Sequence, residues 1–269
     1  MKKIIAMLLM AATLIACFAG CASAPADDAN DGGATIAPVD TFVVGFDAEF
    51  PPMGFIDDNG EYVGFDLDLA AEVAERLGKT IVLQPISWDA KDMELESGNI
   101  DCVWNGFTMT GREDQYTWTD AYMNNNQIVV VMEGSDIVSF SDLAGATVAV
   151  QEDSSAIAAL EANTELYDSL GSVITVDTNM NALMELETGA VDAVVMDEIV
   201  ARYNIEKQGA KYVVLDEVVG AEEFGVGFNL GNTELRDAVQ NALLEMRADG
   251  TLESISNEWF GKDITTIGK

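Results

Sequence analysis

Two charged residues in this sequence could together hold a small zwitterion. Arg112 lies in the segment WNGFTMTGRE, and Asp197 closes the apolar segment VDAVVM. A guanidinium can grip a carboxylate with two parallel hydrogen bonds, whereas a carboxylate can pair with an ammonium group. A charge at the end of so apolar a segment would be costly to bury without a partner. The sequence therefore predicts a site with a positive wall and a negative wall. The alternative for Arg112 is a surface ion pair with Glu113.

The sequence offers few residues for catalysis or for metal binding. The chain contains no histidine, which removes the commonest general base and the commonest metal ligand. Ser154 and Ser155 have no G-x-S-x-G setting and no evident base, so capping a helix is the simpler role for Ser154. The acidic pair Asp57-Asp58 lacks the alternating oxygen ligands of a calcium loop. We therefore predict no catalytic residues, no metal site and no cofactor.

Charge restricts the partners of the chain. The formal net charge is −34, and a surface this acidic repels phosphate groups. Nucleic acid is therefore excluded as a partner. A hydrophobic fraction of 49% argues that most of the chain is folded rather than disordered.

A repeated segment explains why the chain would have two walls. Residues 93–103, MELESGNIDCV, return at 184–194 as MELETGAVDAV, with seven of eleven positions identical. Each copy is typical of a helix end, a glycine stop at Gly98 or Gly189, and a buried strand. A unit used twice, without a third copy, predicts two similar lobes rather than a solenoid. Ligands of open parallel sheets bind beyond the carboxyl ends of strands, where Arg112 and Asp197 would then meet.

Alternating strands and helices place the chain in the α/β class, with mostly parallel sheets. Four short apolar segments are predicted to be buried strands, at 41–47, 100–106, 146–155 and 191–198. Residues 66–77 have apolar side chains on one face of a helix, and Gly78 follows as a stop. Asn59-Gly60 between alternating residues predicts a hairpin over 55–65.

The N-terminus is predicted to be a targeting segment. Lys2 and Lys3 precede an apolar run over 4–16 that is too short to span a bilayer and is typical of a signal peptide. The run ends in LIAC at Cys17 and FAGC at Cys21, which both resemble a bacterial lipobox. We favour Cys21 because small residues surround it, and an ordinary secretory signal is the alternative. Lipidation would anchor the protein in a membrane.

Downstream of that signal, residues 21–40 are expected to form a flexible linker. This stretch is small, acidic and without periodic apolar residues, so it cannot bury enough surface to order itself. One cysteine, Cys102, remains after it. A single thiol within an apolar run is expected to be a small buried hydrophobe.

Several motifs resemble the polar amino-acid family of bacterial extracellular solute-binding proteins, the receptors of ABC importers. The matching segments are VGFDAEFPPMGF, GEYVGFDLDLAAEVAERLG, NIDCVWNGFTMTGRE, YTWTDAYMNN, LAGATVAVQEDSSA, VDAVVMDE and LLEMRADGTLESISNEWFG. Each is weak alone, but their order over residues 41–262 is specific. The resemblance implies the type II periplasmic-binding-protein fold, in which two α/β lobes with mostly parallel sheets are joined by two hinge crossings and close on a ligand.

The resemblance also implies ten ligand-binding residues. They are Asp47, Phe50, Trp88, Asn105, Gly106, Thr108, Arg112, Ser154, Ser155 and Asp197. The two aromatic residues would sandwich the aliphatic part of an amino acid, although read alone they are simpler as core residues. Arg112 and the serine pair at a helix N-terminus would hold the ligand carboxylate. Asp197 would bind the ammonium, and Asp47 the side chain.

The chain departs from the family pattern at three places. Thr110-Gly111-Arg112 is one residue shorter than the usual T-x-x-R. Asp153 stands where the family often has glycine, and an acid beside a carboxylate site repels it unless it turns outward. Trp88 stands where phenylalanine or tyrosine is common.

These observations predict a lipid-anchored receptor that captures a polar or charged amino acid and presents it to an ABC permease. Residues 41–125 and 223–269 would form lobe 1, and 126–222 lobe 2, with hinge crossings near 126–131 and 219–224. A monomer without enzymatic activity is expected.

Two other functions stay open. One is a dehydratase acting on prephenate-like acids, for which Glu49 would be the general acid, and the other is a ligand-sensing subunit. The sequence does not separate Gln, cystine, Lys or Arg, and Glu or Asp as ligands.

Overall fold

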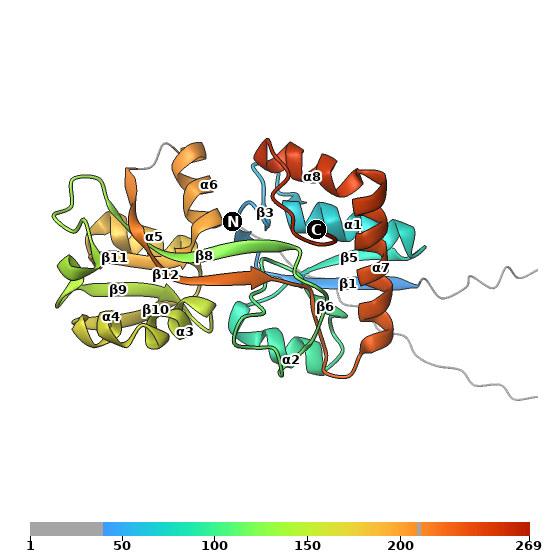
Figure 1. Cartoon of the computed structure of the whole chain (residues 1–269), viewed down its shortest axis with the longest axis horizontal. Coiled ribbons are helices and arrows are strands. Elements are labelled where there is room, and N and C mark those ends of the chain that lie inside the picture. The colour runs from blue at the N-terminus through green and yellow to red at the C-terminus, as the bar shows by residue number, and fades with distance from the viewer. Residues whose placement is uncertain (1–39, 209–210) are drawn as a thin grey trace, which may run out of the picture. The chain divides into compact units, whose positions relative to one another are not determined.

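The computed structural model describes residues 40–208 and 211–269 (Figure 1). The predicted signal peptide at 1–20, the lipidation candidates Cys17 and Cys21, and residues 21–39 of the predicted linker lie outside the described residues. Across the described ranges, none of the helices is both long enough and apolar enough to cross a membrane.

The first five-stranded sheet is built from short strands. Its members are β1 (Thr41–Phe46), β5 (Thr80–Pro85), β6 (Cys102–Val103), β7 (Thr117–Trp118) and β13 (Gly227–Phe228). Their order in space is β5-β1-β6-β13-β7. Only β13 runs against the other four strands of this sheet. Helices α1 (Phe65–Arg76), α2 (Lys91–Glu96), α7 (Thr233–Asp249) and α8 (Thr251–Phe260) accompany it, and together these elements are called lobe 1 below.

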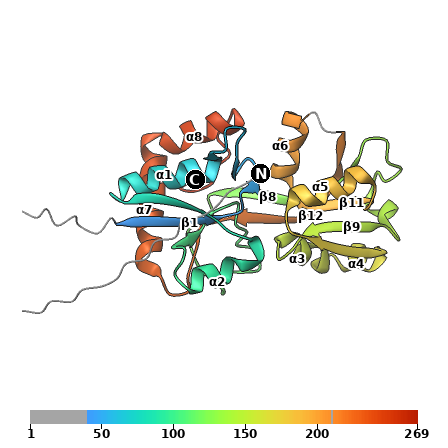
Figure 2. The ribbon, with the colours of Figure 1, turned by 180° about the vertical axis from the view of Figure 1, so that it is seen from behind.

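The second sheet repeats the same plan with longer strands. Its members are β8 (Met123–Met132), β9 (Thr147–Gln151), β10 (Ser172–Val176), β11 (Ala193–Asp197) and β12 (Tyr212–Phe224). Their order is β10-β9-β11-β8-β12, and β8 is the reversed strand. Helices α3 (Ser155–Ala162), α4 (Thr164–Ser169), α5 (Asn179–Thr188) and α6 (Glu198–Gln208) complete lobe 2, as the view from behind shows (Figure 2).

The predicted α/β class with mostly parallel sheets is confirmed. Four of the five strands in each sheet share one direction, and the predicted strands correspond to β1, β6, β9 and β11. The predicted hairpin is a small separate sheet of β2 (Glu49–Phe50), β3 (Gly54–Ile56) and β4 (Tyr62–Val63). Short 3-10 turns at Trp88–Ala90 and Phe140–Leu143 complete the regular structure of the described residues.

The sequence repeat has the predicted helix, glycine and strand structure. Helix α2 precedes Gly98 and β6, and helix α5 precedes Gly189 and β11. The two glycines have φ angles of 74° and 73°, a left-handed conformation that favours glycine at a helix stop. The repeated unit therefore supplies the middle strand of each sheet.

The aspartate that both copies contain fastens the repeat to the preceding strand. In lobe 1, the Val43 N–H donates to the Asp101 carboxylate at 2.7 Å, and the Asp101 N–H donates to the Val43 carbonyl at 2.8 Å. In lobe 2, Thr147 and Asp192 make the same two bonds at 2.8 and 2.9 Å. The conserved aspartate of the repeat thus makes the same two hydrogen bonds to the neighbouring strand in both lobes.

Strands β8 and β12 connect the two lobes. They pair along their length, from Phe224 opposite Met123 to Tyr212 opposite Met132. At the lobe 1 end, Phe224 also bridges to Thr108, and Met123 bridges to Thr265. Both predicted hinge crossings, 126–131 and 219–224, lie within these strands. The exact residue limits of the lobes stay a prediction.

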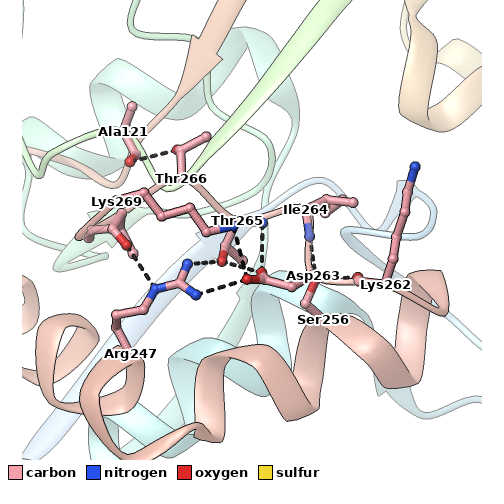
Figure 3. A network of polar contacts seen from close by, with 10 residues as sticks. Ala121, Arg247, Ser256, Lys262, Asp263, Ile264, Thr265, Thr266 and Lys269 are labelled. Carbon is pink, nitrogen blue, oxygen red and sulfur yellow. Dashed lines mark hydrogen bonds and ion pairs between the residues drawn. The ribbon is translucent and has the colours of Figure 1, made fainter.

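A polar network fastens the C-terminal segment beside the start of β8 (Figure 3). Arg247 donates to the Asp263 carboxylate at 2.9 Å, to the Ile267 carbonyl at 3.0 Å, and to the Thr265 hydroxyl. The Lys269 ammonium lies 2.9 Å from the same carboxylate. Burial acts to raise the pKa of Asp263, but the hydrogen bonds from Thr265 and Arg247 outweigh it and hold that pKa well below its usual range.

Candidate functional site

One pocket between the lobes brings together nine of the ten predicted binding residues. Its walls are Phe50, Trp88, Asn105, Gly106, Thr108 and Arg112 from lobe 1, with Gln151, Ser154, Ser155 and Asp197 from lobe 2. The space is narrow, with about 10 Å³ open to the centre of a water molecule. The residues that follow the two copies of the repeat therefore do face one another.

Asp47 is the predicted residue that the structure does not place on the wall. Its carboxylate is buried and accepts hydrogen bonds from the Glu49 N–H at 2.8 Å and from Gln151 Nε2 at 2.8 Å. Burial raises the pKa of Asp47, against the effect of these two bonds. Asp47 thus links lobe 1 to lobe 2 behind the pocket, through Gln151, which sequence reasoning missed.

The backbone at Arg112 is held in a tight turn. Its N–H donates to the Met109 carbonyl at 2.8 Å, and its carbonyl accepts from Trp118 Nε1 at 3.0 Å. The guanidinium lies over the Phe107 ring, 5.4 Å from its centre. Although the loop is one residue shorter than the family's usual T-x-x-R, Arg112 still lines the pocket.

The guanidinium of Arg112 touches both lobes. It donates to the Thr108 carbonyl at 3.4 Å and across the lobes to the Asp153 carbonyl at 3.2 Å. The surface ion pair with Glu113 is not formed, and in the described part of the chain no carboxylate pairs with Arg112. Its charge is therefore available to an anion in the pocket.

The serine pair opens helix α3 at the pocket. Ser154 is the N-cap residue, but its hydroxyl donates to the Gln151 carbonyl at 2.7 Å instead of accepting from a helix N–H. The Ser155 hydroxyl accepts from Thr108 Oγ1 at 3.1 Å and from Gln127 Nε2 at 3.0 Å. Its own proton is thus free to point at a pocket anion, beside the positive end of the helix dipole.

Gly106 needs to be glycine for two reasons. Its φ is 55°, and an added Cβ would lie 2.8 Å from the Phe50 ring. The Gly106 N–H donates to the Asp66 carboxylate at 2.6 Å, and the Tyr122 hydroxyl donates to the same oxygen at 2.8 Å. Burial raises the pKa of Asp66 to about 7, against those two hydrogen bonds. Asp66 therefore positions the loop without touching the pocket.

The remaining walls combine aromatic surface with one unused donor. Phe50 and Trp88 are buried, and Trp88 also meets the Phe107 ring edge to face at 5.4 Å between centroids. Phe50 and Trp88 are thus core residues that also line the pocket, and their contact with a ligand stays a prediction. Asn105 Oδ1 accepts from the Asp47 N–H at 3.1 Å, whereas Asn105 Nδ2 is buried without a partner among the described residues. An acceptor on a ligand could satisfy that donor.

Asp197 lies beside a second carboxyl group that the sequence did not reveal. Asn125 Nδ2 donates to Asp197 Oδ1 at 2.9 Å and to Glu222 Oε1 at 2.6 Å, and Gln127 Nε2 donates to the same Glu222 oxygen at 3.0 Å. Burial, followed by the negative charge of Glu222, raises the pKa of Asp197 well above its usual value.

Asp153 has an unexpected contact with the opposite lobe. It is the one non-glycine residue with positive φ, 54°, among those described. Its half-exposed carboxylate pairs with the ammonium of Lys91, a buried residue of lobe 1. Asp153 is not among the residues that line the pocket, and its carboxylate joins the two lobes instead.

Metal ligation has no support in the described residues. No group of three or more cysteine, aspartate or glutamate side chains is arranged to hold an ion there. Cys102 is buried with a free thiol, as predicted for a small hydrophobic residue. Burial raises the pKa of that thiol.

Two L-cystine-binding proteins are similar to this chain in sequence over most of their length. The L-cystine-binding protein TcyA of Bacillus subtilis (strain 168) is 32% identical over 278 residues, covering 98% of this chain and 100% of that protein. The L-cystine-binding protein TcyJ of Escherichia coli (strain K12) is 32% identical over 228 residues, covering 84% of each.

Solved structures of amino-acid-binding proteins are also similar to this chain. A histidine-bound ABC uptake transporter substrate-binding protein from Streptococcus pneumoniae has a TM-score of 0.81 and 36% identity, covering 84% of this chain and 94% of that chain. An ancestral arginine-binding protein bound to arginine has a TM-score of 0.76 and 38% identity, covering 82% and 98%. The two-lobed type II fold is thereby shown. The family of bacterial extracellular solute-binding proteins, family 3, matches residues 42–262, and the chain belongs to it.

Proposed function

We propose that the protein binds a polar or charged amino acid between its lobes and delivers it to the permease of an ABC transporter. The observation that carries this proposal is the placement of Arg112 and Asp197 on the walls of one pocket. Arg112 has no ion-pair partner in the described residues, and Asp197 is a buried carboxyl next to another carboxyl. An α-carboxylate and an α-ammonium would satisfy both.

The remaining contacts would be divided between carboxylate and side chain. Ser155 and the N–H groups of α3 support a carboxylate next to Arg112. Asn105 Nδ2 offers an unused hydrogen bond, and Phe50 and Trp88 offer apolar surface to a side chain. Relatives named for L-cystine and for arginine, and solved structures with histidine or arginine, make these amino acids the first to test.

The proposed place of action is outside the cytoplasmic membrane. The chain belongs to a family of extracellular proteins and begins with a signal-like segment, and both observations support export. The lipobox-like segments support a lipid anchor at Cys21, or less favourably at Cys17. Mass spectrometry of the protein purified from bacterial membranes would find a diacylated or triacylated N-terminal Cys21 and no residues 1–20.

The dehydratase alternative has little structural support. Glu49, its candidate acid, does not line the pocket, and its carboxylate accepts a hydrogen bond from the Thr178 hydroxyl at 2.9 Å. The family and the relatives are solute-binding proteins of transport systems. A sensing role shares the same pocket, so an adjacent permease gene distinguishes transport from sensing.

A thermal-shift screen tests the proposal. The purified protein is melted with each of the twenty amino acids and with L-cystine. A ligand at 100 times its Kd adds about 2.7 kcal/mol to the free energy of unfolding. That gain raises the Tm by about 2–4 °C for a protein of this size. If none of the twenty-one compounds moves the melt, the proposed function fails.

The ion pair between Lys91 and Asp153 gives a prediction about ligand release. Asp153→Asn removes the charge while keeping a residue type that tolerates positive φ. Lys91 would then be buried without its anionic partner from the other lobe. Because the pair is partly exposed, we expect a loss of about 1.4 kcal/mol in holding the lobes together. Stopped-flow measurements should show the amino acid dissociating about tenfold faster.

A matched control separates this effect from a general loss of charge. Asp40 pairs with Lys79 at 2.5 Å entirely within lobe 1, so Asp40→Asn should leave the dissociation rate unchanged. Equal rates for the Asp153→Asn variant and the unmodified protein would show that the pair has no part in holding the lobes.

A further inference from the structure

Asp197, which lines the pocket, shares a hydrogen-bond donor with a second buried carboxyl group, Glu222, which does not line it. Asp197 is 5% exposed and Glu222 is 7% exposed. One amide nitrogen, Asn125 Nδ2, donates to both, at 2.9 and 2.6 Å. They come from different strands, β11 and β12, which are separated by β8 in the sheet. Their proximity is therefore a product of the fold and not of neighbouring positions in the sequence.

No cation compensates this pair in the described part of the chain. Neither carboxyl takes part in an ion pair. The hydrogen-bond donors from β8 are the neutral amides of Asn125 and Gln127.

Among the described residues, the other elements around the pair present no cation that forms an ion pair with either carboxyl group. Helix α3 presents the neutral Ser155, which Gln127 also contacts. Helix α6 begins with Glu198, whose charge is already used by Asn126 at 2.7 Å and by Arg202 at 2.5 Å. From lobe 1, Arg112 lines the same pocket as Asp197. Arg112 forms no ion pair with Asp197 or Glu222, so no direct ionic contact within the described residues neutralises the pair.

Two adjacent carboxylates in a buried site do not both stay ionised without a cation, because burial and their mutual repulsion favour keeping one proton. We infer that Glu222 is a second carboxyl group of the ammonium-binding site and shares one proton with Asp197, which the ammonium of an incoming amino acid displaces into solvent. This inference rests on the proposed function. The charges balance, since the ammonium replaces the proton as the one positive charge in the pair.

Proton displacement fixes the sign of the pH dependence. The free protein holds one proton more than the complex, so the affinity rises with pH through the titration of the pair and falls at lower pH. The slope is at most about tenfold in Kd per pH unit, the limit for one proton per ligand. Burial also raises the pKa of Asp66, to about 7, so a pH dependence in the unmodified protein alone does not identify the pair.

The variant Glu222→Gln isolates the pair from Asp66. Glutamine keeps the size of the side chain and an oxygen that accepts from Asn125, but it carries no charge and shares no proton. Its neighbour Glu223 is exposed and points away, so Glu223→Gln is a matched control of the same chemistry. Both variants keep Asp66.

The first measurement needs no ligand. Side-chain carboxyl carbons of the free protein, labelled with carbon-13 at aspartate and glutamate, are followed by NMR during a pH titration. We expect the pair to retain one proton at pH 7, detected at the Asp197 carboxyl carbon. In Glu222→Gln the Asp197 titration should move to lower pH, and in Glu223→Gln it should not move. Both carboxyl groups ionised at pH 6 in the free protein would overturn the inference.

The second measurement counts the displaced proton. Calorimetric titrations with L-arginine and L-glutamine, which carry constant charge from pH 6 to 8, are run at pH 7 in phosphate and in Tris. A released proton makes the observed heat depend on the buffer. We expect release of a fraction up to one proton in the unmodified protein and in Glu223→Gln, with much less in Glu222→Gln.

The outcomes separate the two claims. An affinity loss in Glu222→Gln that is the same at every pH, with unchanged proton release, would assign Glu222 a merely structural role and overturn the inference. Failure of every amino acid to bind would contradict the proposed function instead, while the NMR titration still decides whether the pair shares a proton.

Discussion

Replacing Asp197 with asparagine is expected to abolish amino-acid binding while leaving the protein folded. The side chain keeps its size and its contact with Asn125, but the ammonium loses its charged partner. Removing one member of a buried charge pair costs about 3 kcal/mol or more. We therefore expect Kd to rise more than about a hundredfold. Isothermal titration calorimetry measures this change directly.

The same substitution is expected to raise the Tm of the free protein. Burial and the charge of Glu222 raise the pKa of Asp197, so folding at neutral pH works against the ionisation of that carboxyl, and asparagine removes this cost. A variant that melts at the same or a higher temperature and yet binds nothing would show that Asp197 serves the ligand and not the fold.

Asp192→Asn is the control on the same segment. Asp192 accepts from the Thr147 N–H at the start of β9, away from the pocket, so its loss should affect stability but not Kd. Unchanged affinity in Asp197→Asn would end its assignment as the ammonium partner.

Arg112→Lys is expected to have the next largest effect. Arginine can contact the Thr108 and Asp153 carbonyls and still present a planar fork to a carboxylate. Lysine keeps the charge but has one nitrogen for all of these partners. We expect a loss of about 2 kcal/mol, close to thirtyfold in Kd, measured by the same calorimetry.

A control and an analogue make this prediction specific. Arg236→Lys changes an arginine that pairs with Asp237 outside the pocket, so it should leave Kd unchanged. The carboxamide of the amino acid used as ligand has no α-carboxylate. Arg112→Lys should therefore weaken the binding of this carboxamide much less than the binding of the amino acid. Equal losses for the acid and the amide would contradict a carboxylate contact at Arg112.

Much of the fold followed from local sequence patterns. The repeat predicted two copies of a helix, a glycine stop and a strand, and Asp101 and Asp192 now make the same bonds in both lobes. Periodicity located helix α1 to within a residue or two. The reversed strands β8 and β13 left no local signal, because their direction depends on where a distant segment returns to the sheet.

The candidate site was predicted less evenly. Asp197, the last residue of β11, and Arg112, in the loop that follows β6, reach the pocket because the carboxyl ends of these strands face it. Asp47 lies behind the wall because Gln151 of the opposite lobe occupies its carboxylate. Nothing local reveals such a contact between lobes.

Two missed residues show what further signal existed. Val44 pairs with Cys102, and Val148 pairs with Ala193 at the same position of the second repeat. Val44 and Val148 therefore hold equivalent positions in the two lobes, and three residues further on Asp47 is equivalent to Gln151. A comparison of the two lobes would thus have pointed to Gln151. Glu222 was different, because Glu222 and Glu223 point to opposite faces of β12 and the sequence does not tell which is buried.

The central claim is that the pocket recognises both charged ends of an amino acid. Calorimetry with the amino acid that gives the largest thermal shift, its N-acetyl derivative and its carboxamide tests this claim most directly. We predict binding of the amino acid at one site per chain, no measurable binding of the N-acetyl derivative, and strongly weakened binding of the carboxamide. Binding of either derivative with the affinity of the parent amino acid would contradict the account.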